Sequence, residues 1–228
     1  MLKKQKKLSR KEIKEDKLVE FYYNSLSFFE KNKSKVFTYL GAIVIVVIAV
    51  IMYMNYRNDQ NETAGAELAK IIDMYDRGDF LGAIEGNKDT KVNGLKEIVA
   101  QFGSTENGET AKIYLADSYA NLGKNEEAFK YYSDYEGGIN IFVAASLAGQ
   151  ASYYSVKKEY EQAADLYMKA SKVTESPARN SDYIFEAAVN YFEAGEKDQA
   201  KSLFQSIKED YKTSMVYSQV DRYLNQLN

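Results

Sequence analysis

The longest apolar stretch of the chain runs from Val36 to Met54 and contains no charged residue in 19 positions. A helix of that length rises about 28 Å, which is close to the thickness of the hydrocarbon layer of a bilayer. Lysines precede the stretch, Arg57 follows it, and tyrosines lie at both ends, where aromatic side chains favour the headgroup region. The pattern therefore predicts a membrane-spanning helix over residues 36–56.

Two alternatives to a retained membrane helix are a buried core helix of a soluble protein and a cleaved signal peptide. Soluble cores rarely use about 18 or more uninterrupted apolar residues. The basic region before the stretch, 35 residues long, is longer than that of a usual signal peptide, and the small-x-small site Ala64-Gly65-Ala66 lies ten residues past the apolar run. A retained anchor is therefore the favoured interpretation.

Beyond residue 57 the apolar pattern repeats in three segments, which start at Glu109, Ala144 and Ser181. Small residues recur at repeat positions 8 and 20, and aromatic residues recur at positions 11 and 24. The small residues let two helices of a hairpin approach closely, and the aromatic residues fill the space between neighbouring hairpins. The residues that carry this pattern are Ala116, Ala128, Ala151, Ala163, Ala188, Ala200, Tyr119, Tyr132, Tyr154, Tyr167, Tyr191 and Phe204.

Further helical segments flank the three copies. A degenerate fourth copy is expected over residues 64–103, with matching residues at Gly78, Phe80 and Ala83. Within its extension, the stretch from Val92 to Phe102 predicts a helix. Residues 214–227 predict an amphipathic helix that caps the last hairpin, because the end of a solenoid needs a cover for its apolar face.

The turns inside the three copies read LGKNEE, VKKEYE and AGEKDQ, and Gly123 and Gly195 are natural helix terminators there. With residues at matching offsets in three copies, residues 57–228 resemble the tetratricopeptide repeat family. The resemblance implies a tetratricopeptide-type α-solenoid. Together with the predicted membrane-spanning helix, this gives an all-α fold in which a single N-terminal transmembrane helix is followed by the solenoid. A helical bundle with fortuitous alanines and tyrosines is the alternative, and such a bundle would not keep three copies in phase.

Charge is divided unevenly along the chain. Residues 1–35 hold 11 Lys/Arg against 5 Asp/Glu, and residues 57–228 hold 19 against 28. Because positive residues stay on the cytoplasmic side, we expect residues 1–35 in the cytoplasm and residues 57–228 outside. The tail has a basic start, expected to orient the chain and contact phospholipid, and an amphipathic helix expected against the inner leaflet. These features are carried by Lys3, Lys4, Lys6, Lys7, Arg10 and Lys11, and by Leu18, Phe21, Tyr22, Phe28 and Phe29.

Catalysis is not expected. The chain has no cysteine and no histidine, which removes thiol nucleophiles, imidazole acid–base chemistry and the usual zinc ligand sets. The acidic residues follow an (i, i+4) pattern with lysines, typical of solvated helix faces: Glu126 with Lys130, Asp165 with Lys169, and Glu193 with Lys197. We predict no enzyme activity, no metal, no cofactor, no small-molecule substrate and no nucleic-acid partner.

The surface expected to act is the concave face that the first helices of the hairpins build. A groove with two phenylalanines at one end and small polar residues at its middle could hold an extended or helical peptide. The alternative is that Phe185 and Phe192 are covered by the capping helix. The residues expected on this face are Ile113, Asp117, Ala120, Ala148, Ser152, Ser155, Phe185, Val189 and Phe192.

Along the chain, a lysine-rich tail containing KEDKLVEFYYNSLSFFEKNKSKV is followed by one predicted membrane helix and then by the tetratricopeptide-like domain. In this order the chain is similar to YfgM-like proteins, ancillary subunits of the bacterial Sec translocon. The resemblance implies a single-pass protein of the bacterial inner membrane, with a periplasmic domain that associates with translocon subunits, envelope chaperones or exported clients. A scaffold for another envelope assembly, such as cell-wall or division machinery, is the alternative.

Overall fold

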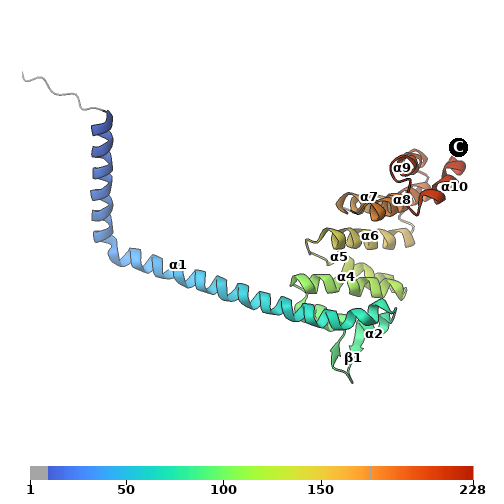
Figure 1. Ribbon diagram of the computed structural model, residues 1–228, viewed down its shortest axis with the longest axis horizontal. Coiled ribbons are helices and arrows are strands. Elements are labelled where there is room, and N and C mark those ends of the chain that lie inside the picture. Colours follow the sequence, from blue (N-terminus) through green and yellow to red (C-terminus); the bar gives the residue numbers. More distant parts are fainter. Residues whose placement is uncertain (1–9, 175, 228) are drawn as a thin grey trace, which may run out of the picture. The chain divides into compact units, whose positions relative to one another are not determined.

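The computed structural model describes residues 10–174 and 176–227, with side chains described from residue 17 onward (Figure 1). The basic start of the tail, Lys3 to Lys11, therefore lies outside the described side chains. The described part is mainly helical. Its elements in chain order are α1 (Arg10–Asp76), α2 (Phe80–Glu85), β1 (Gly86–Asn87), β2 (Val92–Asn93), α3 (Leu95–Phe102), α4 (Glu106–Asn121), α5 (Asn125–Ser133), α6 (Asn140–Val156), α7 (Tyr160–Val173), α8 (Pro177–Ala194), α9 (Lys197–Asp210) and α10 (Tyr217–Leu227).

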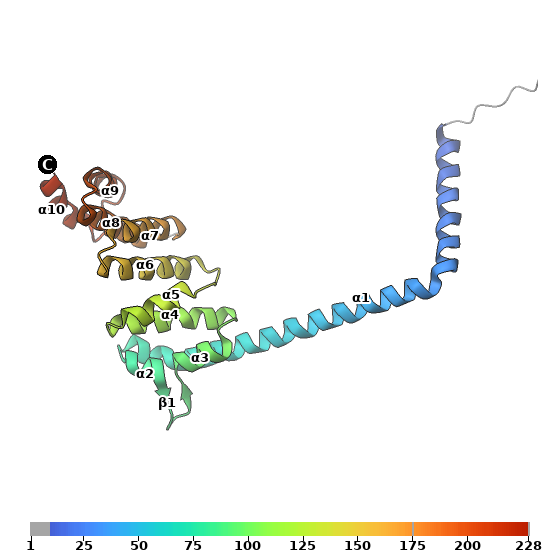
Figure 2. The same ribbon diagram turned by 180° about the vertical axis from the view of Figure 1, so that it is seen from behind.

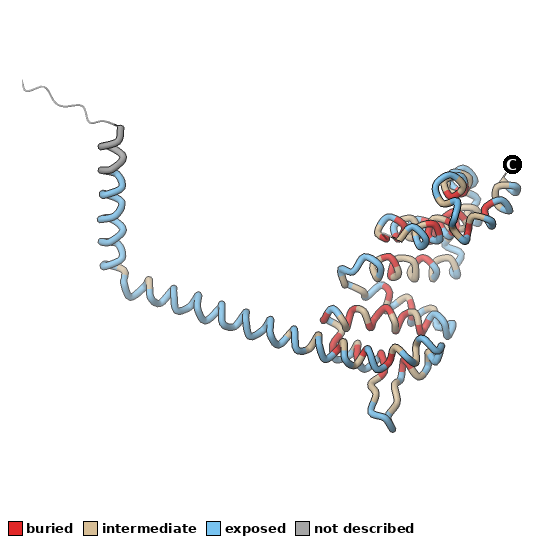
Figure 3. The backbone as a smooth tube through the Cα atoms, in the orientation of Figure 1, coloured by how far each residue is buried: buried red, intermediate tan, exposed pale blue. Residues whose placement is uncertain are grey.

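The chain divides into two compact units between Tyr56 and Arg57. In the first unit, the part of α1 over residues 36–56 is largely exposed (Figure 3). Its large apolar side chains are open, and Ile45, for example, is 69% exposed. Within the described residues, α1 is the helix long and apolar enough to cross a membrane, by length and composition. The expected N-terminal apolar helix is thus present, and its crossing of a membrane stays a prediction.

Helix α1 also joins parts that the sequence suggested as separate helices. The amphipathic segment around Phe21 and Phe28, the apolar stretch, and the first helix of the degenerate copy all belong to this one helix. The only proline of the chain is Pro177, and no glycine of α1 takes a positive φ. Nothing in the local sequence therefore ends the helix before Asp76.

The second unit is a row of stacked α-hairpins. The pairs α4–α5, α6–α7 and α8–α9 follow one another, and each second helix packs on the first helix of the next pair (Figure 2). The last turns of α1 form a fourth hairpin with α2, and α10 packs against α9 at the other end. This arrangement is the predicted α-solenoid.

The four hairpins share one backbone turn. Repeat position 15 has a positive φ in every copy, and the following N–H donates to the carbonyl oxygen of position 11 at 2.9 Å each time. This is the closing bond of a left-handed helix cap, which favours glycine because a Cβ is strained there. The position 15 residues are Gly78, Gly123, Lys158 and Gly195, and the donors are Asp79, Lys124, Glu159 and Glu196.

The core lies between the helices of each hairpin and between neighbouring hairpins (Figure 3). The alanines at positions 8 and 20 are at most 3% exposed, so the helices approach as closely as the sequence predicted. The aromatic residues at position 24 are buried as well, with Phe204 fully enclosed. Small side chains next to large ones give the interlocking contact that stabilises stacked repeats.

Two predicted helices differ in extent. The stretch from Val92 to Phe102 was expected to be helical throughout, yet Val92 and Asn93 form β2, which pairs antiparallel with β1. Gly94 separates this strand from α3, and the side chain of Asn87 accepts the Asp89 and Thr90 N–H groups at 2.9 and 3.1 Å to form the hairpin turn. The capping helix begins at Tyr217, since Ser214 to Val216 form a turn.

Candidate protein-binding hollow on the first helices

A hollow of about 330 Å³ opens on the surface formed by the first helices of the hairpins. We call it the first-helix hollow. Its walls come from the end of α1 and from α4, α6 and α8, so four successive hairpins contribute to it. The lining residues are Tyr75, Ile113, Tyr114, Asp117, Ile141, Phe142, Ala145 and Arg179.

One wall of the first-helix hollow is a ladder of aromatic rings. The Tyr75 and Tyr114 ring centroids are 4.9 Å apart, and the Tyr114 and Phe142 centroids are 6.4 Å apart, both edge to face. All three side chains are half-buried, and the neighbouring Ile141 is 47% exposed. Aromatic side chains held in fixed rotamers offer apolar contact area at little entropic cost.

The floor of the hollow is polar and is centred on Asp117. This carboxylate accepts a hydrogen bond from the Tyr75 hydroxyl at 3.3 Å and another from the Tyr132 hydroxyl. Burial raises the pKa of Asp117, while the two hydrogen bonds and the charge of Arg179 act in the opposite direction. Burial also raises the pKa values of both tyrosines, and the adjacent negative charge raises them further. Asp117 therefore joins α1, α4 and α5 through neutral tyrosines.

Arg179 places a positive charge at the edge of the hollow. Its side chain is exposed, and its charge lowers the pKa values of Asp117 and Tyr183 against the effect of burial. The hollow thus presents an aromatic wall, a carboxylate at its floor and a cation at its rim. Such a combination suits a peptide that offers one apolar side chain together with backbone or side-chain polar groups.

The nine residues expected on the first-helix face do not form one continuous groove. Ile113 and Asp117 line the first-helix hollow, whereas Ala120 and Ser152 line a second depression of about 60 Å³ beside Tyr132. Ala148 is half-buried against the core cluster formed by α6, α7 and α8, and Ser155 is half-buried. The structure thus brings Ile113 together with Asp117, and Ala120 together with Ser152, in two separate depressions.

The far end of the expected groove is covered. The Phe185 ring is 6% exposed, and its centroid lies 5.7 Å from that of Tyr223 on α10. Phe192 packs on the same tyrosine at 5.6 Å, and Val189 packs against the same cluster. Of the two alternatives, Phe185 follows the second, because it is buried under the capping helix, whereas Val189 and Phe192 are half-buried beside it.

The aromatic and charged residues that shape the hollow were missed by the repeat pattern. Tyr114 follows the predicted Ile113 directly, and Tyr75 lies in the degenerate copy, one residue past position 11. Phe142 and Arg179 both stand two residues before the assigned starts of their copies, since α6 and α8 begin four residues earlier than those starts. Extending the repeat toward its N-terminus would have placed them on the same face.

The acidic residues considered for chemistry are engaged in other contacts than those expected. Glu126 binds Lys157 of the next hairpin at 2.7 Å rather than Lys130. Asp165 accepts a hydrogen bond from Tyr191 at 2.7 Å rather than pairing with Lys169. Within residues 10–174 and 176–227, no group of three or more acidic side chains is placed to hold a metal ion.

Residues 182–214 match the family model of the tetratricopeptide repeat. This stretch is a tetratricopeptide repeat. It begins one residue after Ser181, the start assigned to the third copy, and it contains most of α8, all of α9 and the turn that follows. No curated protein and no solved structure matches the chain. The match supports a role in binding other proteins.

Proposed function

We propose that this chain is a membrane-anchored adaptor that binds segments of other proteins in the first-helix hollow. The observation that carries the proposal is the half-exposed aromatic ladder of Tyr75, Tyr114 and Phe142 beside the exposed Ile141. Apolar side chains left open in a hollow between stacked repeats mark a surface for a partner. The tetratricopeptide match at residues 182–214 supports the same function.

The anchor in this proposal is the part of α1 over residues 36–56. Its exposed apolar side chains and the positive charge that precedes it support a single-pass topology in the bacterial inner membrane, with the N-terminus in the cytoplasm and residues 57–228 in the periplasm. Protease added to intact spheroplasts should degrade the C-terminal unit. Complete protection of that unit in spheroplasts, with cleavage after lysis, would contradict the orientation.

The partners we propose are translocon subunits, envelope chaperones or exported clients. This choice follows from the similarity in the order of parts to YfgM-like proteins. The alternative is a scaffold for cell-wall or division machinery, which would use the same hollow.

Purification of the full chain from membranes in mild detergent separates these two functions. Translocon subunits and chaperones in the eluate support the first function, whereas cell-wall enzymes without translocon subunits support the second. The variant Ile141→Glu places a charge at the rim of the hollow and should lose the partners. Val156→Glu, at the other end of α6 and 59% exposed, is the matched control and should keep them.

A further inference from the structure

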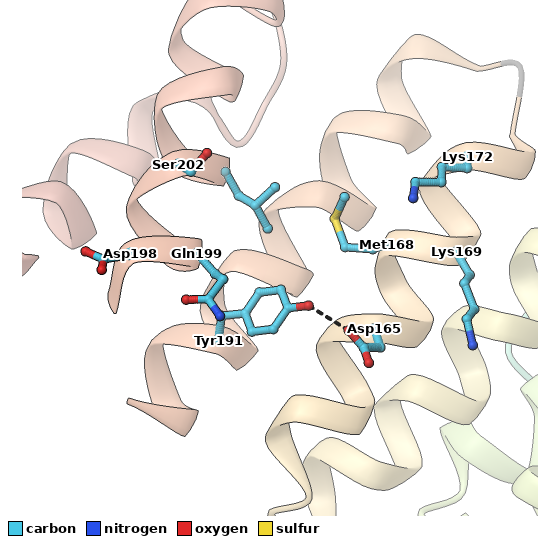
Figure 4. Close-up of a pocket in the computed structure, with 9 residues that line it drawn as sticks. Asp165, Met168, Lys169, Lys172, Tyr191, Asp198, Gln199 and Ser202 are labelled. Atoms are coloured by element: carbon cyan, nitrogen blue, oxygen red, sulfur yellow. Dashed lines mark hydrogen bonds between the residues drawn. The ribbon is translucent and has the colours of Figure 1, made fainter. Parts of the chain in front are cut away.

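A larger hollow lies between the second helices of the last two hairpins (Figure 4). It has a volume of about 700 Å³, and we call it the second-helix hollow. It shares no residue with the first-helix hollow, and α7 and α9 form its two walls. The lining residues are Asp165, Met168, Lys169, Lys172, Tyr191, Asp198, Gln199, Ser202 and Leu203.

The floor of the second-helix hollow is apolar. Met168 from α7 and Leu203 from α9 are half-buried there, and Tyr191 reaches in from the end of α8. The Tyr191 hydroxyl donates to Asp165 Oδ1 at 2.7 Å, a contact visible in Figure 4. Because this bond occupies the tyrosine hydroxyl, the ring and the two aliphatic side chains remain as an apolar strip between the walls.

The two walls differ in charge. Lys169 and Lys172 project from α7, both are exposed, and neither forms an ion pair within 4.0 Å with another described residue. The α9 wall offers the neutral Gln199 and Ser202, with Asp198 at its far edge (Figure 4). The α7 wall also carries Asp165, whose Oδ1 accepts the Tyr191 hydroxyl, so two lysines stand there against one aspartate. A net positive wall is unusual in this unit, because residues 57–228 hold 19 Lys/Arg against 28 Asp/Glu.

We propose that the second-helix hollow docks a short amphipathic helix of a partner protein whose one flank is acidic. The apolar ridge of that helix would lie between Met168 and Leu203, and its acidic flank would pair with Lys169 and Lys172. The lining residues of α7 run from Asp165 to Lys172, which corresponds to a rise of about 10 Å or two helical turns. Apolar residues at helical spacing fill a groove of this kind, and the charged flank fixes the direction of the bound helix.

This docking site goes beyond the function proposed for the first-helix hollow. Since the two hollows share no lining residue, an occupant of one leaves the other open. The adaptor would then hold a client segment and a helical partner at the same time.

A pair of synthetic peptides tests the proposal directly. Each is about 14 residues long, near the shortest length at which isolated helices persist, and carries leucines at every third or fourth position. One has glutamates along a flank and the other has lysines there. Binding of each labelled peptide to the full chain, held in nanodiscs of neutral phospholipid, is measured by fluorescence anisotropy.

The acidic peptide should bind the unaltered chain, although the unit as a whole is negatively charged. The double change Lys169→Glu with Lys172→Glu should weaken this binding by about tenfold or more and strengthen binding of the lysine peptide, because both wall charges reverse. The matched control, Lys88→Glu with Lys91→Glu on the distant β1–β2 turn, should change the affinity for the acidic peptide by less than about twofold. Circular dichroism checks that each variant is folded. If a glutamate pair prevents folding, the same two lysines are replaced by glutamine instead.

Three outcomes would overturn the proposal. The first is that the acidic peptide does not bind the unaltered chain. The second is that both pairs of lysine changes weaken binding equally, which indicates attraction to overall charge only. The third is that Ile141→Glu abolishes binding while the α7 changes do not, which places the peptide in the first-helix hollow.

Discussion

The hydroxyl of Tyr132 donates a hydrogen bond to the carboxylate of Asp117, joining the second helix of a hairpin to the first. The other oxygen of Asp117 accepts a bond from Tyr75 at 3.3 Å, so one carboxylate connects α1, α4 and α5. Tyr132 also borders the smaller depression beside the first-helix hollow. The shape of the candidate binding surface therefore depends on this contact.

Replacing Tyr132 with phenylalanine should destabilise the C-terminal unit by about 1–3 kcal/mol, because a partly buried carboxylate loses a donor. Urea unfolding of the full chain in detergent, followed by circular dichroism, measures the change. Tyr131→Phe is the control on the same helix: its ring stacks on Tyr119, and it should shift stability by less than about 0.5 kcal/mol. Equal effects of the two changes would show that the Tyr132 hydroxyl contributes little.

Asp117 should make the free energy of unfolding of the C-terminal unit depend on pH. Burial raises its pKa in the folded state above the value of about 3.9 in an unfolded chain, so the folded state binds the proton more tightly. As pH falls from 7 through the raised pKa, the unaltered chain should gain stability relative to Asp117→Asn. The gain should level off below the unfolded pKa. Unfolding curves at a series of pH values measure this difference, and a difference that shrinks with falling pH would contradict the assignment.

Lys158 occupies the turn position where the other three hairpins have glycine, with φ of 63°. A non-glycine residue in this left-handed region destabilises the folded state by about 1–2 kcal/mol. Glycine avoids this strain, but it loses more conformational entropy on folding, which offsets part of the gain. Lys158→Gly should therefore raise the free energy of unfolding by about 0.5–1 kcal/mol. Gly195→Ala, at the equivalent turn of the next hairpin, should lower it. A loss of stability in both variants would argue against a shared turn.

Gly149 should not tolerate alanine, although alanine normally stabilises the interior of a helix. A Cβ at this position would overlap Cδ2, Cε2 and Cζ of Tyr132, whose ring is held by the bond to Asp117. We expect Gly149→Ala to destabilise the unit by about 1–3 kcal/mol. In a Tyr132→Ala background the same change should become neutral or stabilising, which a double-mutant cycle of unfolding free energies tests. An unchanged penalty in that background would exclude the ring as its cause.

The fold could be predicted largely because each copy carries its own local signals. Alanine at positions 8 and 20 and aromatic residues at position 24 determine how the helices pack, and these positions are buried as expected. The sequence did not predict β2, since two residues are too short for a strand pattern and Gly94 separates them from α3. Nor did it predict the left-handed turn at Lys158, because lysine gives no signal for positive φ.

The candidate site was predicted only in part. Ile113 and Asp117 follow from the repeat register, yet the aromatic ladder includes residues that the register did not assign to this face, such as Phe142. The burial of Phe185 depends on its contact with Tyr223. This contact between α8 and α10 is set by tertiary packing, which leaves no periodic pattern in the sequence. The second-helix hollow likewise arises from the spacing between α7 and α9 in the folded chain.

Site-specific photo-crosslinking in living cells tests the central claim, which is that the first-helix hollow holds other proteins. A photoreactive amino acid at Ile141 lies at the rim of the hollow, and the same amino acid at Val156 lies at the opposite end of α6. We predict discrete crosslinked species containing a second protein from position 141, reduced by Tyr114→Ala, and few or none from position 156. Equal crosslinking at the two positions, or none at position 141, would contradict the account.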